Sequence, residues 1–163
     1  MVAAGDPIES SDVNELYLHK RGARSTDSSP TSGTTEVGVI RIDNCDFKAG
    51  KAYMVCSGNL RPDLTVATDR VKVNLRYSSA GAATNSSGEI GRVESATVGD
   101  LNSLPPVMGM IYPTADEPTA SVRMSIVRPT GTGTFFLEAD PTHGIQIFIH
   151  CLGDDPGDTG TDE

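Results

Sequence analysis

The side chains of this sequence that could act as nucleophile, base or metal ligand are few, and their spacing matches no known catalytic arrangement. The histidines are His19, His143 and His150, and none lies in a His-Glu-x-x-His sequence or another recognised metal-binding pattern. His150 precedes Cys151, but neighbouring residues of a strand face opposite sides, which argues against a Cys/His dyad. We therefore predict a protein that is not an enzyme and that carries no catalytic residue, metal or cofactor.

The cysteines do not suggest a disulfide framework or a zinc site. Cys45, Cys56 and Cys151 are widely spaced and form no Cys-x-x-Cys sequence. We expect free thiols inside the fold. Cys45 and Cys56 would approach each other if their strands formed a hairpin, and the sequence leaves that pairing open.

Most of the acidic charge lies at the end of the chain. The formal net charge is −9, and five of the negative charges come from Asp154, Asp155, Asp158, Asp162 and Glu163. Such a balance argues against binding nucleic acid, which requires lysines and arginines to displace counterions from phosphates. The segment 153–163 has no side chain suited to a core, so we expect a mobile acidic tail.

The first residues have neither the basic nor the apolar region of a secretory signal. No apolar stretch of about 18 residues is present, which is the length that a membrane-spanning helix needs. We therefore expect a protein made in the cytoplasm and not bound to a membrane.

The clearest structural signal is the alternation between Asp69 and Tyr77. Every second residue from Arg70 to Arg76 is polar, and the residues between them are apolar. This period of two is typical of a strand with one buried face. Seven further segments with strand character follow or precede it between turns rich in Gly, Pro, Ser and Thr. The expected strands are 36–44, 51–58, 69–77, 89–98, 107–112, 121–128, 134–139 and 144–152.

Eight short strands with apolar stripes predict an all-β protein in which two antiparallel sheets pack face to face. We favour such a β-sandwich over a closed barrel, and the jelly roll is one of the sandwich topologies that fit. The core should consist mainly of Val, Ile, Leu and Met, because the chain has 4 Phe, 4 Tyr and no Trp.

Three regions follow from the pattern: an N-terminal arm and linker at 1–35, the sandwich at 36–152 and the acidic tail at 153–163. Asp12 and Glu15 have the spacing of a helix capping box, so a short helix is expected before the linker. The segment 22–35 is rich in Gly, Ser and Thr and should be extended. The arm can dock on a neighbouring molecule or fold back on its own domain, and the sequence favours neither.

Several segments resemble small virion proteins of tailed bacteriophages, notably those that infect actinobacteria. Near the start these are Gly5-Asp6-Pro7-Ile8 and Ser11-Asp12-Val13-Asn14. In the body they are 34–39, 49–53 and 69–77. The likeness extends over most of residues 1–152. The resemblance implies a structural protein that is part of the virion, as minor tail proteins and other accessory components are.

In that role the arm would bind other virion proteins, either of the tail or the major capsid protein. We predict that the contacts are made by Pro7, Ile8, Asp12, Val13, Leu16 and Tyr17. We expect a homo-oligomer with cyclic symmetry, a trimer being the favoured number. A minor tail or fibre protein is the first hypothesis and a capsid decoration protein the second. A carbohydrate-binding module for host attachment is a more distant alternative.

Overall fold

The computed structural model describes residues 19–58, 60–66, 69–95, 104–139, 144–155 and 157. These residues form strands and turns, with no helix among them. The strands are β1 (Lys20–Arg24), β2 (Val37–Ile42), β3 (Lys51–Ser57), β4 (Pro62–Leu64), β5 (Arg70–Ser78), β6 (Gly88–Ser95), β7 (Met108–Ile111), β8 (Ser121–Thr130), β9 (Phe135–Leu137) and β10 (Ile145–Asp154).

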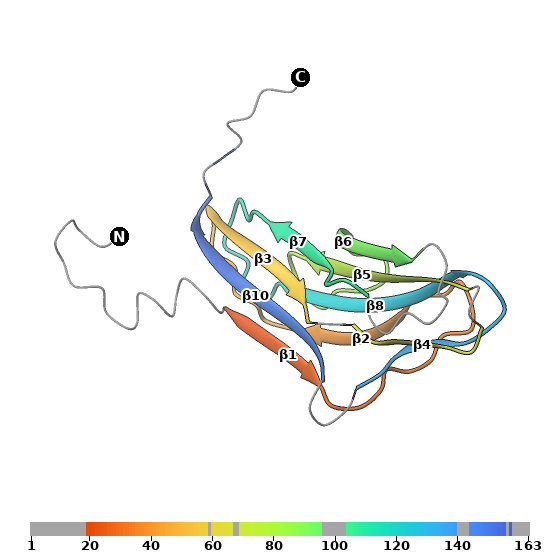
Figure 1. Ribbon diagram of the computed structural model, residues 1–163. Helices are drawn as coiled ribbons and strands as arrows, with labels where there is room; N and C mark the ends of the chain where they lie inside the picture. The colour runs from red at the N-terminus through yellow and green to blue at the C-terminus, as the bar shows by residue number, and fades with distance from the viewer. Residues whose placement is uncertain are drawn as a thin grey trace, which may run out of the picture.

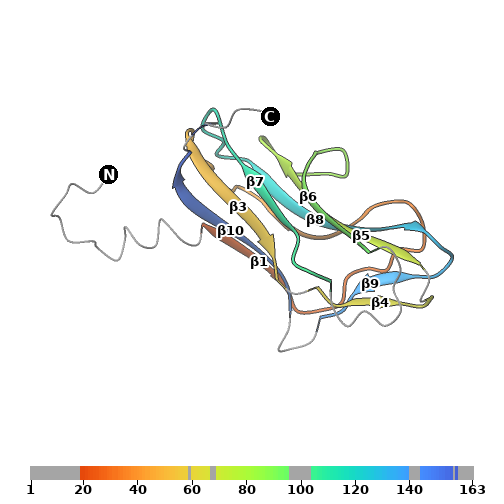
Figure 2. The same cartoon turned by 45° about the horizontal axis from the view of Figure 1, so that its top comes forward.

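Two four-stranded antiparallel sheets lie face to face (Figures 1 and 2). The first sheet has the strand order β1-β10-β3-β7 and the second has the order β2-β8-β5-β6. Apart from the β5–β6 hairpin, each step between consecutive strands of these two sheets passes from one sheet to the other. This alternation is the jelly-roll topology, and the predicted all-β sandwich is confirmed. A two-stranded sheet of β4 and β9 closes one end.

All eight strands expected from the sequence are present, with ends shifted by a few residues. Two strands were not predicted. β1 is an edge strand with the sequence KRGAR, in which no apolar alternation exists. β4 has only three residues and begins with Pro62. β1 is a strand because it pairs with β10, and β4 because it pairs with β9. Neither strand can therefore be recognised from its own sequence.

The segment 22–35 differs from the predicted extended linker. Its first residues belong to β1, and later ones pair with β9. The Thr31 and Phe135 backbones exchange two hydrogen bonds, and the Ser28 N–H donates to the Leu137 carbonyl at 2.9 Å. Ser28 and Thr31 are buried. The hydroxyl-rich composition that suggested a linker supplies side chains small enough to lie against the sandwich.

The core between the sheets consists mainly of Val, Ile, Leu and Met, as predicted. Alternate residues of each strand point into it, for example Val71, Val73 and Leu75 of β5 and Ile145, Ile147 and Ile149 of β10. Phe47, Tyr53 and Phe135 are its largest buried side chains.

The two sheets approach each other closely at the edge where β6 meets β7. A Cβ added to Gly91 would lie 2.1 Å from the Met108 carbonyl oxygen, and one added to Gly109 would lie 2.4 Å from the Ile90 oxygen. Only glycine has the space for this backbone contact. The open edges of β6 and β7 therefore cover each other, which limits edge-to-edge pairing with other chains.

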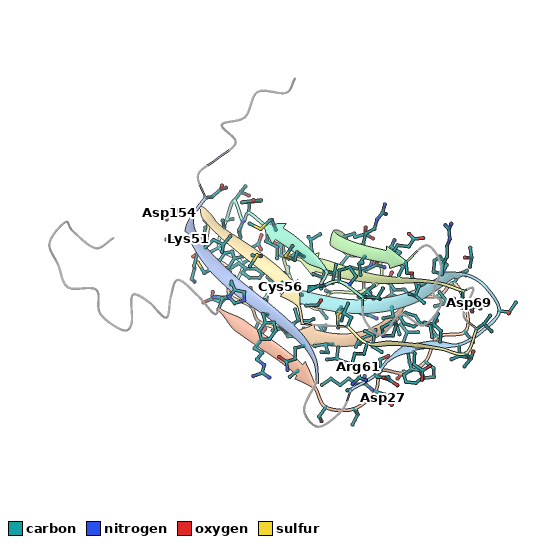
Figure 3. All side chains as sticks on the ribbon, viewed as in Figure 1. Asp27, Lys51, Cys56, Arg61, Asp69 and Asp154 are labelled. Atoms are coloured by element: carbon teal, nitrogen blue, oxygen red, sulfur yellow. The ribbon has the colours of Figure 1, made fainter. Side chains whose placement is uncertain are left out.

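Opposite ends of the sandwich are fixed by charged side chains (Figure 3). At one end Lys51 Nζ lies 2.8 Å from an Asp154 carboxylate oxygen, and β10 continues to Asp154, so the predicted tail begins inside a strand. At the other end buried Asp69 accepts hydrogen bonds from the Thr132 and Gly133 backbone N–H groups. No helix in the described residues has the length and hydropathy of a membrane span.

Candidate interaction surface

The arm residues predicted to bind a partner, Pro7, Ile8, Asp12, Val13, Leu16 and Tyr17, lie outside the residues that the structure describes, as does the predicted short helix. His19 is the first residue that the structure describes, and it is anchored by backbone and ring contacts. Its backbone N–H donates to the Ile149 carbonyl at 2.7 Å, and its ring packs against Phe47 and Tyr53. The imidazole Nε2 also forms a hydrogen bond with the Cys45 carbonyl. His19 is therefore attached to the first sheet next to β1.

The outer face of the first sheet carries a group of mostly apolar side chains, which is unusual for a surface exposed to water. In β3, β7 and β10 the residues that alternate with the core positions point outward. We define the apolar face as the outward side chains Met54, Cys56, Met108, Met110, Phe148 and His150.

Strand register arranges these side chains in two rows across the sheet. Phe148, Cys56 and Met108 lie opposite one another on β10, β3 and β7, and Arg21 of β1 extends this row. The Arg21 guanidinium carbon lies 5.8 Å from the centroid of the Phe148 ring, within the range of a cation–π contact. His150, Met54 and Met110 form the second row. Cross-strand neighbours of this kind make a continuous surface.

Exposure of large hydrophobic side chains is concentrated at the first sheet, and two of the exposed residues, Met108 and Met110, belong to the apolar face. Among the described residues four large hydrophobic side chains are exposed: Met108 by 62%, Tyr112 by 51%, Leu152 by 50% and Met110 by 36%. All four belong to the first sheet or, for Tyr112, to the residue directly after β7. Contiguous exposed apolar surface of this kind marks sites where soluble proteins bind other molecules.

The outer face of the second sheet is different, because it is charged and its charges are mostly paired. Arg76 Nε lies 2.6 Å from Glu36 Oε1, and Lys72 Nζ lies 3.4 Å from Glu89 Oε2. A face with satisfied charges is compatible with permanent contact with water. The contrast singles out the first sheet as the surface that gains most from being covered.

Cysteine positions settle the pairing that the sequence left open: Cys45, Cys56 and Cys151 are all free. Cys45 is buried in the core, whereas Cys56 is half-buried on the apolar face. Burial raises the pKa of the Cys56 thiol, so it is a small apolar group at neutral pH. The methionine side chains beside it are flexible and polarisable, so this face can adapt its shape to a partner surface.

The side chains considered for catalysis are not brought together. His150 points outward from β10, and Cys151 packs against the core on the other side of the same strand. His143 lies outside the described residues. Within the described ranges, no three His, Cys, Asp or Glu side chains are grouped as metal ligands would be.

Sequence reasoning missed the apolar face, although its signal is present. Met108, Met110 and Tyr112 alternate with Val107, Gly109 and Ile111, and both sets are apolar or glycine. A strand that is apolar on both faces indicates coverage on both sides. The segment 107–112 was correctly predicted as a strand, but its second apolar face was not interpreted.

Comparison with known proteins gives no relative by sequence: neither a family model nor a curated protein matches this chain. Solved structures share the sandwich architecture at low similarity. A CBM22-1 xylan-binding domain from Paenibacillus barcinonensis is 9% identical, with a TM-score of 0.43 and coverage of 86% of this chain and 94% of that domain. The CBM22-1 and GH10 modules of a Clostridium thermocellum xylanase give 11% identity and a TM-score of 0.39, over 91% of this chain.

This chain spans only 28% of the Clostridium thermocellum protein. A carbohydrate-binding module of a Cellvibrio mixtus lichenase has 9% identity and a TM-score of 0.33 over 82% of this chain and 97% of that module. β-Sandwiches with unrelated functions share architecture at this level, so these likenesses assign no ligand to this chain.

Proposed function

We propose that this protein is a non-enzymatic structural subunit that assembles on a larger particle by covering the apolar face of its first sheet. The observation that carries the proposal is that the four exposed large hydrophobics of the described residues lie in the first sheet or directly beside it: Met108, Met110 and Leu152 in its strands and Tyr112 directly after β7. Methionine and aromatic side chains are enriched in the buried centre of protein interfaces. Their partner is therefore another protein surface.

The particle that we propose is the virion of a tailed bacteriophage, on the strength of the sequence resemblance described above. The fold is compatible with that role, since jelly rolls occur in viral capsid domains, although they occur in lectins as well. A minor tail or fibre protein is our first proposal and a head decoration protein the second. In either case the subunits form a homo-oligomer, with threefold symmetry as our expectation.

Two substitutions of different surfaces test the assembly proposal. Met108→Lys places a charge in the apolar face at a position whose side chain is already 62% exposed, so the fold should be retained. Thr130→Lys adds the same charge at an exposed position of the second sheet and serves as the matched control. We expect Met108→Lys to be lost from purified particles, by at least about tenfold, because burying an unpaired charge costs more than 1.4 kcal/mol.

Quantitative mass spectrometry of purified particles gives the answer and separates the two locations. A few copies per particle indicate a tail protein, and hundreds indicate a decoration protein. Circular dichroism checks that both variants are folded. Incorporation of Met108→Lys at the level of the control would refute the role of the apolar face, and particles that never contain the protein would refute the virion proposal.

The carbohydrate-binding alternative receives less support from the geometry. Sugar-binding platforms need exposed aromatic rings. Tyr53, however, is buried, and the Tyr77 hydroxyl donates a hydrogen bond to the Glu117 carboxylate. Tyr112 is the one exposed tyrosine in the described part of the chain. A glycan array with the purified protein tests this alternative directly.

A further inference from the structure

Three arginines lie side by side across the outer face of the second sheet, on the opposite side of the molecule from the apolar face. In the strand register Arg123 of β8 lies opposite Arg41 of β2 on one side and opposite Arg76 of β5 on the other. Like charges directly opposite each other destabilise a pair of strands. A neighbouring anion at a guanidinium of this row would offset this repulsion.

Two of the three arginines have one. Glu36 binds Arg76 with both carboxylate oxygens, at 2.6 Å and 2.7 Å from Nε and Nη2. Arg41 Nε lies 2.9 Å from an Asp43 oxygen in an exposed pair. Arg123 differs, because no hydrogen bond or ion pair joins its guanidinium to any residue that the structure describes. The row thus carries one uncompensated positive charge on a chain whose formal net charge is −9.

Arg123 is also held in place. A Cβ built on Gly38 would lie 2.5 Å from Arg123 Nη2 and 2.9 Å from its guanidinium carbon. The guanidinium therefore rests on the β2 backbone at Gly38, in space that any other residue would fill. The side chain is half-buried rather than free in water. A positioned, unpaired guanidinium has already lost much of the rotamer entropy that binding an anion would otherwise cost.

From this geometry we propose that Arg123 and Arg41 together form a binding site for an oxyanion, the carboxylate or phosphate group of a ligand. Planar guanidinium groups bind both kinds of group through two parallel N–H···O bonds. The exposed Arg41–Asp43 pair contributes little stability, so Arg41 can turn toward a bound anion at small cost. Glu36 remains on Arg76 and does not compete for the site.

Titration of the full chain with inorganic phosphate and, separately, with citrate at constant ionic strength tests the site. Binding is followed through the backbone amide NMR signals of residues near Arg123. Arg123→Gln should weaken binding by at least about tenfold, since charge-assisted hydrogen bonds contribute more than 1.4 kcal/mol. Arg92→Gln removes the same charge from an arginine of that sheet that already pairs with Glu89, and it should bind as the wild type does.

Gly38→Ala is the more specific variant, because it keeps every charge. The new methyl group meets the mobile end of Arg123, which can move aside, so the protein should fold while the guanidinium is displaced. Weaker binding in both Gly38→Ala and Arg123→Gln supports the site. Preference for phosphate or citrate identifies the group that it takes. Absence of binding to either anion, or equal losses in Arg123→Gln and Arg92→Gln, overturns the proposal. Met108→Lys should bind the anion normally, so this test is independent of the assembly proposal.

Discussion

Glu36 is the carboxylate that organises the outer face of the second sheet. Its oxygens accept hydrogen bonds from Arg76 and from the fully buried Ser125 hydroxyl. Burial alone would raise the pKa of Glu36, but the hydrogen bonds from Arg76 and Ser125 outweigh it and lower that pKa below its usual value of 4.5. The ionised form is therefore the one that stabilises the fold.

Glu36→Gln should lower the free energy of unfolding by about 1 to 3 kcal/mol at pH 7, because it removes hydrogen bonds to a charged group. The folded pKa is depressed, so this stabilisation is present above pH 4.5 and is lost as the pH falls through the lower folded value. Urea denaturation at several pH values should show wild type and variant converging in acid. Glu94→Gln, an exposed change in β6, is the control, and an equal pH profile for both variants would contradict the assignment.

Cys45 should resist alkylation in the native protein. Burial raises the pKa of its thiol to about 11, and the side chain has no exposed surface. Compared with the unfolded chain, iodoacetamide at pH 8 should label it at least about a hundredfold more slowly, since the thiolate is the reactive form. Peptide mass spectrometry measures this rate residue by residue. Labelling of native Cys45 at the unfolded rate would show that the core around it opens readily.

At the scale of elements, alternation along a strand was enough to find the eight strands that line the core. It was not enough for β1, which contains Gly22 between charged residues and is a strand only because β10 offers its open edge. The same limit applies to the interaction surface. The apolar face exists because register aligns Phe148, Cys56 and Met108 from strands far apart in sequence, and no local pattern contains that alignment.

The contact between β6 and β7 gives a prediction at this scale. Gly91→Ala would put a methyl group 2.1 Å from a backbone oxygen that cannot move aside, so the two strand edges must separate. We expect a loss of about 2 kcal/mol or more in unfolding free energy. Gly88→Ala in the same strand is the matched control, because its nearest neighbour lies 3.9 Å away. A thermal melt compares the two, and equal melting temperatures would contradict the close contact.

For the whole molecule, the succession of eight apolar-striped strands pointed correctly to a β-sandwich, but the strand order required the structure. The expected boundary between arm and body at residue 35 also needs revision, since β1 already belongs to the first sheet. Among the described residues, hydrogen bonding to β10 already includes the backbone N–H of His19, so this residue belongs to the body. Composition does not reveal such pairing, because a Gly- and Ser-rich segment looks the same whether or not an edge strand receives it.

Two truncations test that revised boundary. Removing residues 1–18 should leave the melting temperature nearly unchanged, because the strands of both sheets remain. Removing residues 1–24 also deletes β1 and uncovers the edge of β10, so the melting temperature should fall by at least about 5 °C. Differential scanning calorimetry compares the two proteins. Equal melting temperatures would show that β1 adds nothing to the sandwich.

The pairing of β1 with β10 joins the first described strand of the chain to the last. On the ribosome, residues 20–24 must wait for residues 145–154 to be synthesised before the first sheet can close. Contacts between such distant parts of a sequence also make folding slow. The surface that we propose for assembly therefore cannot form before residues 145–154 have been synthesised.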